Sequence, residues 1–153
     1  MKFTVFAFLM LFASHSVNAQ ASPSPSKADQ TNPDLHVDPS SAKVSLGKAT
    51  LIVNPLTYKG KLYVGDYQLT VVPYFFMSET GVLELTASDD AMRKLLGGTA
   101  VPFTGKASNN KQGKPKAITG TITPTTRTQG NVTFSVETDN GPMVFNTTYH
   151  FGE

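Results

Sequence analysis

The sequence predicts an all-β domain: a small antiparallel β-barrel or β-sandwich of about seven strands with one short α-helix. Three observations predict this fold class. Thr, Val, Tyr and Phe dominate residues 44–153, and residues typical of turns interrupt them at short intervals. Only the segment after Ser88 has the spacing of an amphipathic helix. The last two predicted strands alternate apolar and polar residues, as antiparallel strands with one buried face do.

The predicted strands follow one another through the domain, with turns at Gly65-Asp66 and at residues 78–81. Gly60 is the expected bulge or bend if the first stretch is one long strand rather than two. The strands are expected at residues 49–64, 67–76, 82–87, 99–107, 116–125, 131–138 and 143–151. The element order, β-β-β-α-β-β followed by a hairpin, is similar to that of an OB-type barrel in element order only.

The predicted helix begins after Ser88, a favourable N-cap residue. Asp89 and Asp90 occupy its first turn, where carboxylates complement the helix dipole, so we interpret them as structural rather than catalytic. The apolar side chains recur at the spacing of one helix face: Met92, Leu95 and Leu96. Gly97 or Gly98 is expected to end the helix in a left-handed conformation.

The last two strands make a register prediction. If Thr138 opposes Met143, the apolar residues of both strands fall on one face. The expected pairs on that face are Val136 with Phe145, Phe134 with Thr147, and Val132 with Tyr149. Pro142 has no N–H to close a tight two-residue turn, so we expect a four-residue loop.

Residues 1–19 have the pattern of a secretory signal peptide. Lys2 precedes an apolar stretch at residues 3–13, and Val17-Asn18-Ala19 supplies small residues at the positions that signal peptidase accommodates. Cleavage is therefore predicted after Ala19. The apolar stretch has about half of the roughly 20 residues that a spanning helix needs. We expect a secreted or periplasmic protein with no transmembrane segment after cleavage.

Residues 20–43 are predicted to be a disordered Ser/Pro-rich linker that precedes a single β-domain at residues 44–153. The segment contains four prolines among Ser, Asp and Asn, and its only large apolar residues are Leu35 and Val37. Such a composition buries too little surface to offset the entropy of ordering.

Charge and composition exclude several function classes. Without residues 1–19 the chain keeps 12 basic and 11 acidic residues, so its net charge near +1 is no footprint for nucleic acid. The absence of Cys excludes disulfides, a thiol nucleophile and a lipid anchor attached to a thiol. No motif in the sequence indicates a cofactor or a metal site.

Two weak features suggest where a ligand binds. Consecutive aromatic residues in the 67–76 strand must point to both faces of the sheet, so Tyr74 and Phe76 are candidates for an exposed patch. The 106–116 loop is rich in lysine and has no acidic residue, which suits an anionic polymer, a phosphate headgroup or an acidic protein. Its candidate residues are Lys106, Lys111, Lys114 and Lys116.

No residue is assigned a catalytic role. His150 is one of the two histidines outside residues 1–19, and no Ser lies in a nucleophile-elbow motif. Our main hypothesis is an exported, non-enzymatic β-domain that binds an envelope or extracellular component or serves a structural role. One alternative is a small carrier barrel with an interior cavity of several hundred cubic ångströms for an apolar ligand. A second is a small secreted hydrolase, in which two acids, or His150 and an acid, converge in one pocket.

Overall fold

Alternating apolar residues build a single antiparallel sheet in the computed structural model, which describes residues 32–153 except residues 46, 112 and 153. The expected signal peptide and the first part of the expected linker lie outside the described residues. Within the described part, the elements are β1 (Leu35–Val37), β2 (Ser40–Val44), β3 (Gly47–Val53), β4 (Thr57–Lys59), β5 (Leu62–Val72), the 3-10 turn η1 (Phe75–Met77), β6 (Glu79–Thr86), α1 (Asp89–Leu96), β7 (Val101–Asn109), β8 (Lys116–Pro124), β9 (Gln129–Val136) and β10 (Met143–Phe151).

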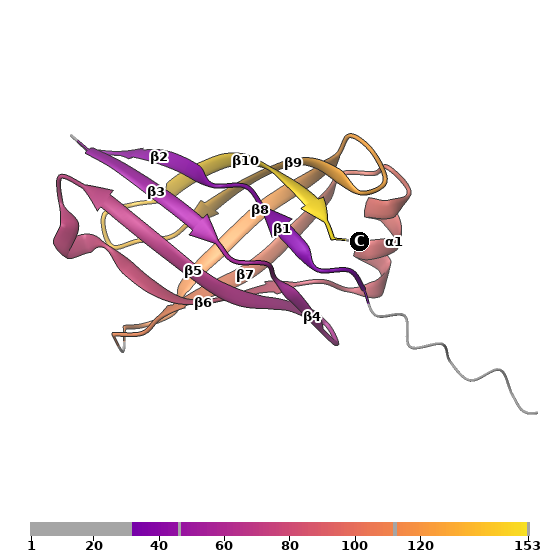
Figure 1. The fold of residues 1–153 in the computed structure, drawn as a ribbon, viewed down its shortest axis with the longest axis horizontal. Coiled ribbons are helices and arrows are strands. Elements are labelled where there is room, and N and C mark those ends of the chain that lie inside the picture. Colours follow the sequence, from indigo (N-terminus) through magenta and orange to yellow (C-terminus); the bar gives the residue numbers. More distant parts are fainter. Residues whose placement is uncertain (1–31, 46, 112, 153) are drawn as a thin grey trace, which may run out of the picture. The chain divides into compact units, whose positions relative to one another are not determined.

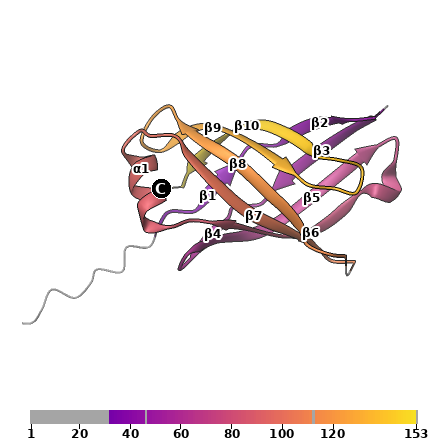
Figure 2. The same ribbon diagram turned by 180° about the vertical axis from the view of Figure 1, so that it is seen from behind.

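The sheet curls into a half-barrel (Figures 1 and 2). From β5 to β10 each strand pairs antiparallel with the next one along the chain, while β3 pairs with β5 and β2 pairs with β3. The short β4 forms a hairpin with the start of β5, and Gly60, with φ 72°, provides the left-handed residue of its turn. The last strand, β10, pairs with β1. These neighbours make β5 to β10 an up-and-down meander.

The two end strands of the sheet are consecutive in the chain. Only two residues separate β1, which pairs with β10, from β2, which pairs with β3. Leu35 and Leu56 also exchange two backbone hydrogen bonds, each with an N···O distance of 2.9 Å. The 35–44 stretch therefore provides backbone partners at both ends of the curled sheet, whose edges would otherwise be unpaired.

Side chains fill the interior of the half-barrel. Phe134 and Phe145 stack with ring centroids 5.3 Å apart, and Ile118 and Leu83 are buried beside them. The voids that remain between the interior side chains measure about 20 to 30 Å³ each. Among the described residues, these interior voids are far smaller than the cavity of several hundred cubic ångströms that the carrier alternative requires.

The predicted helix is confirmed. Ser88 caps α1, its Oγ accepting a hydrogen bond from the Ala91 N–H at 3.1 Å, and Gly98 follows with φ 86°. Met92 and Leu95 are buried against the same end of the sheet as Tyr63. Figures 1 and 2 show α1 at this end, opposite the end where η1 joins β5 to β6.

The all-β class with a single α-helix is confirmed, but the strands are more numerous than expected and their neighbours follow chain order rather than an OB arrangement. Part of the difference comes from the expected linker. Residues 35–43 contain β1 and most of β2, and Leu35 is only 3% exposed. The linker prediction relied on average composition, whereas a few apolar residues in register suffice for an edge strand.

The turn expected at Gly65-Asp66 is wrong, because both residues lie inside β5. Gly65 is needed there for close packing. A Cβ at this position would lie 2.8 Å from the Leu56 side chain and 2.9 Å from the Pro55 carbonyl oxygen. A glycine within a strand can mark such a close approach as well as a turn.

The turn after β5 comes earlier than expected. β5 ends at Val72, and β6 already begins at Glu79, so the segment predicted as strand end and turn contains η1 instead. Pro73 cannot donate a backbone hydrogen bond to a neighbouring strand, which explains the end of the ladder. The Ser78 hydroxyl oxygen accepts a hydrogen bond from the Val71 N–H at 2.9 Å and ties the returning chain to β5.

The predicted register of the last hairpin is wrong by two residues. Met143 pairs with Val136 and Phe145 with Phe134, because Thr138 is used in the loop, where its carbonyl accepts a hydrogen bond from the Gly141 N–H at 3.0 Å. A shift of two residues preserves the faces of a strand, so the predicted apolar side still faces the core.

None of the helices in the described part of the chain is long and apolar enough to cross a membrane.

Replacing Leu35 tests whether the 35–44 stretch belongs to the cooperative fold. We expect Leu35→Ala to lower the free energy of unfolding by about 3 kcal/mol, measured by urea denaturation, because it leaves a cavity at a buried position. The control Ser41→Ala changes an exposed residue of β2 and should cost less than about 0.5 kcal/mol. Equal, small effects of both variants would show that this stretch behaves as a linker.

Candidate functional site

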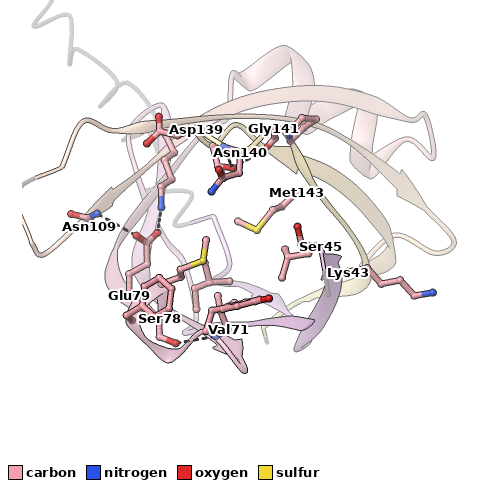
Figure 3. A pocket seen from close by; sticks show the side chains of 18 of the residues that line it. Lys43, Ser45, Val71, Ser78, Glu79, Asn109, Asp139, Asn140, Gly141 and Met143 are labelled. Carbon is pink, nitrogen blue, oxygen red and sulfur yellow. Dashed lines mark hydrogen bonds and ion pairs between the residues drawn. The ribbon is translucent and has the colours of Figure 1, made fainter. Parts of the chain in front are cut away.

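A cavity with a volume of about 800 Å³ lies at the end of the half-barrel opposite α1 (Figure 3). We call it the mouth pocket. Four connections surround it: the β2–β3 turn, η1, the β7–β8 loop and the β9–β10 loop. Its lining residues include Lys43, Leu69, Val71, Tyr74, Phe76, Met77, Glu79, Asn109, Lys111, Lys116, Asp139, Asn140 and Met143.

Apolar side chains line the inner part of the mouth pocket. Leu69 and Val71 point inward from β5 and are buried, and Met143 contributes from the start of β10. Tyr74 and Phe76 add aromatic rings from the η1 side, with centroids 6.0 Å apart in an edge-to-face arrangement. This lining favours an apolar group in the pocket.

Glu79 is the main charged group within the mouth pocket. Its carboxylate accepts hydrogen bonds from Lys116 Nζ at 2.5 Å, from the Tyr67 hydroxyl at 3.0 Å and from Asn109 Nδ2 at 3.2 Å. The Glu79 side chain is 10% exposed and that of Lys116 is 26% exposed. The cluster therefore joins the first residue of β6 to β5, β7 and β8.

The surroundings of Glu79 shift two pKa values in opposite directions. Burial alone raises the pKa of Glu79, but the hydrogen bonds from Lys116 and Asn109, the Lys116 charge and the Tyr67 hydroxyl outweigh it, so the net pKa lies below its usual value. Burial and the neighbouring Glu79 carboxylate raise the pKa of Tyr67. The cluster therefore favours an ionised Glu79 carboxylate beside a neutral Tyr67 phenol.

The β7–β8 loop is folded against η1 by its own polar groups. Asn109 Oδ1 accepts hydrogen bonds from the backbone N–H groups of Lys111 at 3.2 Å and Gly113 at 3.0 Å. Lys111 Nζ donates to the Ser78 carbonyl oxygen at 3.4 Å. This contact holds Lys111 at the rim of the mouth pocket. Among the described residues, the partner of its ammonium group is an uncharged carbonyl.

The structure brings together four of the six residues predicted to bind a ligand. Tyr74, Phe76, Lys111 and Lys116 all line the mouth pocket. Lys106 does not, because it points to the outer face and forms an ion pair with Glu84 at 2.9 Å. Lys114 lies in the same loop but is not part of the lining. That any of these residues binds a ligand stays a prediction.

Sequence reasoning missed most of the other residues of the mouth pocket lining, among them Glu79, Asn109 and Met143. The sequence predicts a turn at residues 78–81, which includes Glu79. In the structure Glu79 is the first residue of β6, and its side chain contacts Lys116 at the end of the lysine-rich loop. The only sequence signal for it is the excess of lysines in a loop that the topology places next to β6. Met143 was expected in the last strand but without a role at the pocket.

A second cavity of about 720 Å³ contains His150 and Asp38, the kind of pair that the hydrolase alternative requires. His150 stacks on His36, with ring centroids 4.6 Å apart and an interplanar angle of 12°. The Asp38 carboxylate accepts a hydrogen bond from the Thr148 hydroxyl. Within residues 32–153, apart from the gaps, no hydrogen bond joins His150 to Asp38, and no three His, Asp or Glu side chains are grouped to hold a metal ion.

Comparisons of the chain with protein families, with curated proteins and with solved structures found no match.

Neutralising Glu79 tests the charge cluster. We expect Glu79→Gln to lower the free energy of unfolding at pH 7 by about 2 kcal/mol, because Lys116, Tyr67 and Asn109 lose a charged acceptor. The control Glu84→Gln breaks a pair with the largely exposed Lys106 and should cost less than about 1 kcal/mol. Urea denaturation measures both variants.

The pH dependence of the same experiment has a defined sign. Since the folded-state pKa of Glu79 is lowered, its contribution is fully present above the unfolded value near 4.5 and is lost as the pH falls through the folded value. The difference in stability between the unmodified chain and Glu79→Gln should therefore shrink below pH 4.5. A difference that stays constant down to acidic pH would contradict the ionised cluster.

Proposed function

We propose that the protein is an exported, non-enzymatic β-domain that binds an envelope or extracellular component in the mouth pocket. In this proposal residues 1–19 direct export and are removed after Ala19, and the remaining chain is secreted or periplasmic. The observation that carries the proposal is the convergence of apolar walls and lysines on one cavity of about 800 Å³. Such a volume is typical of sites for small molecules.

The chemistry of the pocket favours an amphipathic ligand with an anionic group. Leu69, Val71 and Met143 offer an apolar surface to one part of the ligand. Glu79 is already compensated by Lys116, whereas Lys111 Nζ donates to a backbone carbonyl and forms no ion pair with any other described residue. Lys111 is therefore the group best placed to pair with an anion at the rim.

The two alternatives differ in where a ligand would bind. A carrier barrel would have to use the mouth pocket, because the voids in the packed interior hold no more than about 30 Å³. A hydrolase would use the second cavity with His150 and Asp38. The mouth pocket supports the binding proposal better, because Glu79, the less exposed of the two acids in its lining, is occupied by three hydrogen-bond donors.

Binding of anilinonaphthalene sulfonate, an apolar anion, tests the mouth pocket directly. We expect one binding site per chain, seen as increased fluorescence. Lys111→Glu should weaken the affinity about tenfold by reversing the charge at the rim, which corresponds to ~1.4 kcal/mol. Met143→Ser should also weaken it by removing apolar wall surface.

The matched control is Lys59→Glu, the same charge reversal at an exposed position of the β4–β5 hairpin, at the α1 end of the half-barrel. It should leave the affinity within about twofold, since exposed charges more than about 10 Å apart are largely screened at moderate salt. An equal loss of affinity in Lys59→Glu and Lys111→Glu, or no loss in either, would show that the probe does not bind in the mouth pocket.

Export is tested by expressing the full chain in its own host and measuring the intact mass of the protein in the extracytoplasmic fraction. We expect the mass of residues 20–153. Recovery in the cytosol with residues 1–19 attached would contradict the export proposal and leave the pocket experiment unaffected.

A further inference from the structure

The rim of the mouth pocket carries consecutive apolar side chains that face solvent. Phe75, Phe76 and Met77 of η1 are 65%, 81% and 39% exposed, and Val72 at the end of β5 is 47% exposed. We call these four residues the apolar lip. The other exposed large apolar residues of the described part of the chain, Ile52, Leu96 and Val144, lie on three separate elements, so within that part such side chains cluster only at the lip.

The backbone holds the apolar lip in its projecting position. The Phe75 N–H donates to the Pro73 carbonyl, the Met77 N–H to the Tyr74 carbonyl, and the Ser78 N–H to the Phe75 carbonyl, at distances of 2.9 to 3.1 Å. Tyr74 also contacts the Phe76 ring edge to face. The exposed rings are thus presented by a hydrogen-bonded turn.

Lysines surround the apolar lip. Lys48 is the register partner of Val72 on β5 and of Lys43 on β2, and both lysines are exposed. Lys111 reaches the lip from the β7–β8 loop through its contact with the Ser78 carbonyl. Among the described residues, none of these three lysines is in an ion pair.

The two carboxylates of the mouth pocket lining do not cancel these charges at the lip. The Glu79 side chain is 10% exposed and is paired with Lys116. Asp139 lies on the β9–β10 loop, and Figure 3 shows it across the mouth pocket from Ser78 and Val71. Figure 3 also shows Lys43 extended away from the cavity toward solvent.

We propose that the apolar lip docks the protein on the surface of an anionic phospholipid bilayer. In this arrangement Phe75 and Phe76 enter the boundary between headgroups and acyl chains, and Lys43, Lys48 and Lys111 lie at the level of the headgroup phosphates. Exposed aromatic residues flanked by lysines match both parts of an anionic interface, the apolar boundary and the negative surface potential. Phe75 is not part of the mouth pocket lining, so this docking goes beyond the proposed ligand binding and does not require it.

The test is sedimentation of residues 20–153, which include all described residues, with vesicles of phosphatidylglycerol or of phosphatidylcholine. Residues 1–19 are omitted because their apolar stretch would itself enter a bilayer. We expect binding to phosphatidylglycerol that weakens with added salt, and little binding to phosphatidylcholine. Phe75→Ser and Phe76→Ser should each lower the partition coefficient about tenfold, and Lys43→Gln and Lys48→Gln about fivefold each.

Ile52→Ser is the matched control, because it replaces an apolar residue that is 43% exposed outside the lip. It should partition like the unmodified chain. The proposal is overturned if Phe75→Ser partitions like Ile52→Ser, if both vesicle types bind equally, or if the lip instead joins two copies, seen as a dimer in size-exclusion chromatography that Phe75→Ser dissociates. Phe75→Ser should keep its affinity for anilinonaphthalene sulfonate, so failure of docking and failure of the pocket are distinguishable.

Discussion

The pairing of the 35–44 stretch with both ends of the sheet is the constraint on which the rest of the structure depends. A curled antiparallel sheet has two edges with unpaired backbone groups, and such edges invite pairing with other chains. Here β1 pairs with β10, β2 pairs with β3, and Leu35 exchanges backbone hydrogen bonds with Leu56. Because these pairings hold the curl, they also fix the ring of connections around the mouth pocket.

At the mouth of the half-barrel, the Glu79 cluster likewise ties neighbouring strands together. A carboxylate with so little exposure is tolerated because donors from three other strands satisfy it. Lys116 and Asn109 flank the β7–β8 loop on either side, so the cluster also anchors the loop that carries Lys111. The charge of Glu79 is compensated internally, so the lysines at the rim, with Asp139 on the β9–β10 loop, determine the electrostatic character of the pocket.

Several features of the fold were predictable from local sequence. The Ser88 cap, the acidic first turn and Gly98 define α1 without reference to the rest of the molecule. Alternation of apolar residues identified the buried faces of β9 and β10 correctly, because face depends only on a period of two. Their register was wrong by two residues, since it depends on how many residues the loop uses, and Thr138 belongs to the loop.

Features that depend on distant contacts were not predictable in the same way. Gly65 resembles a turn residue in sequence, but it accommodates Leu56, whose position is set by the partner Leu35. Likewise β1 and β2 have the composition of a linker and become strands because edges of the sheet are available to them. Aromatic and lysine content pointed to four of the residues at the mouth pocket, whereas Lys106 was misplaced because its side chain direction is set by its place on β7, opposite Glu84.

The most direct test of ligand binding at the mouth is a titration of ¹⁵N-labelled residues 20–153 with anilinonaphthalene sulfonate, followed by backbone amide chemical shifts. The predicted result is a contiguous set of shifted amides in the four connections around the mouth pocket, with the α1 end unchanged. Shifts centred on the second cavity, around Asp38 and His150, or shifts spread evenly over the sheet, would contradict it.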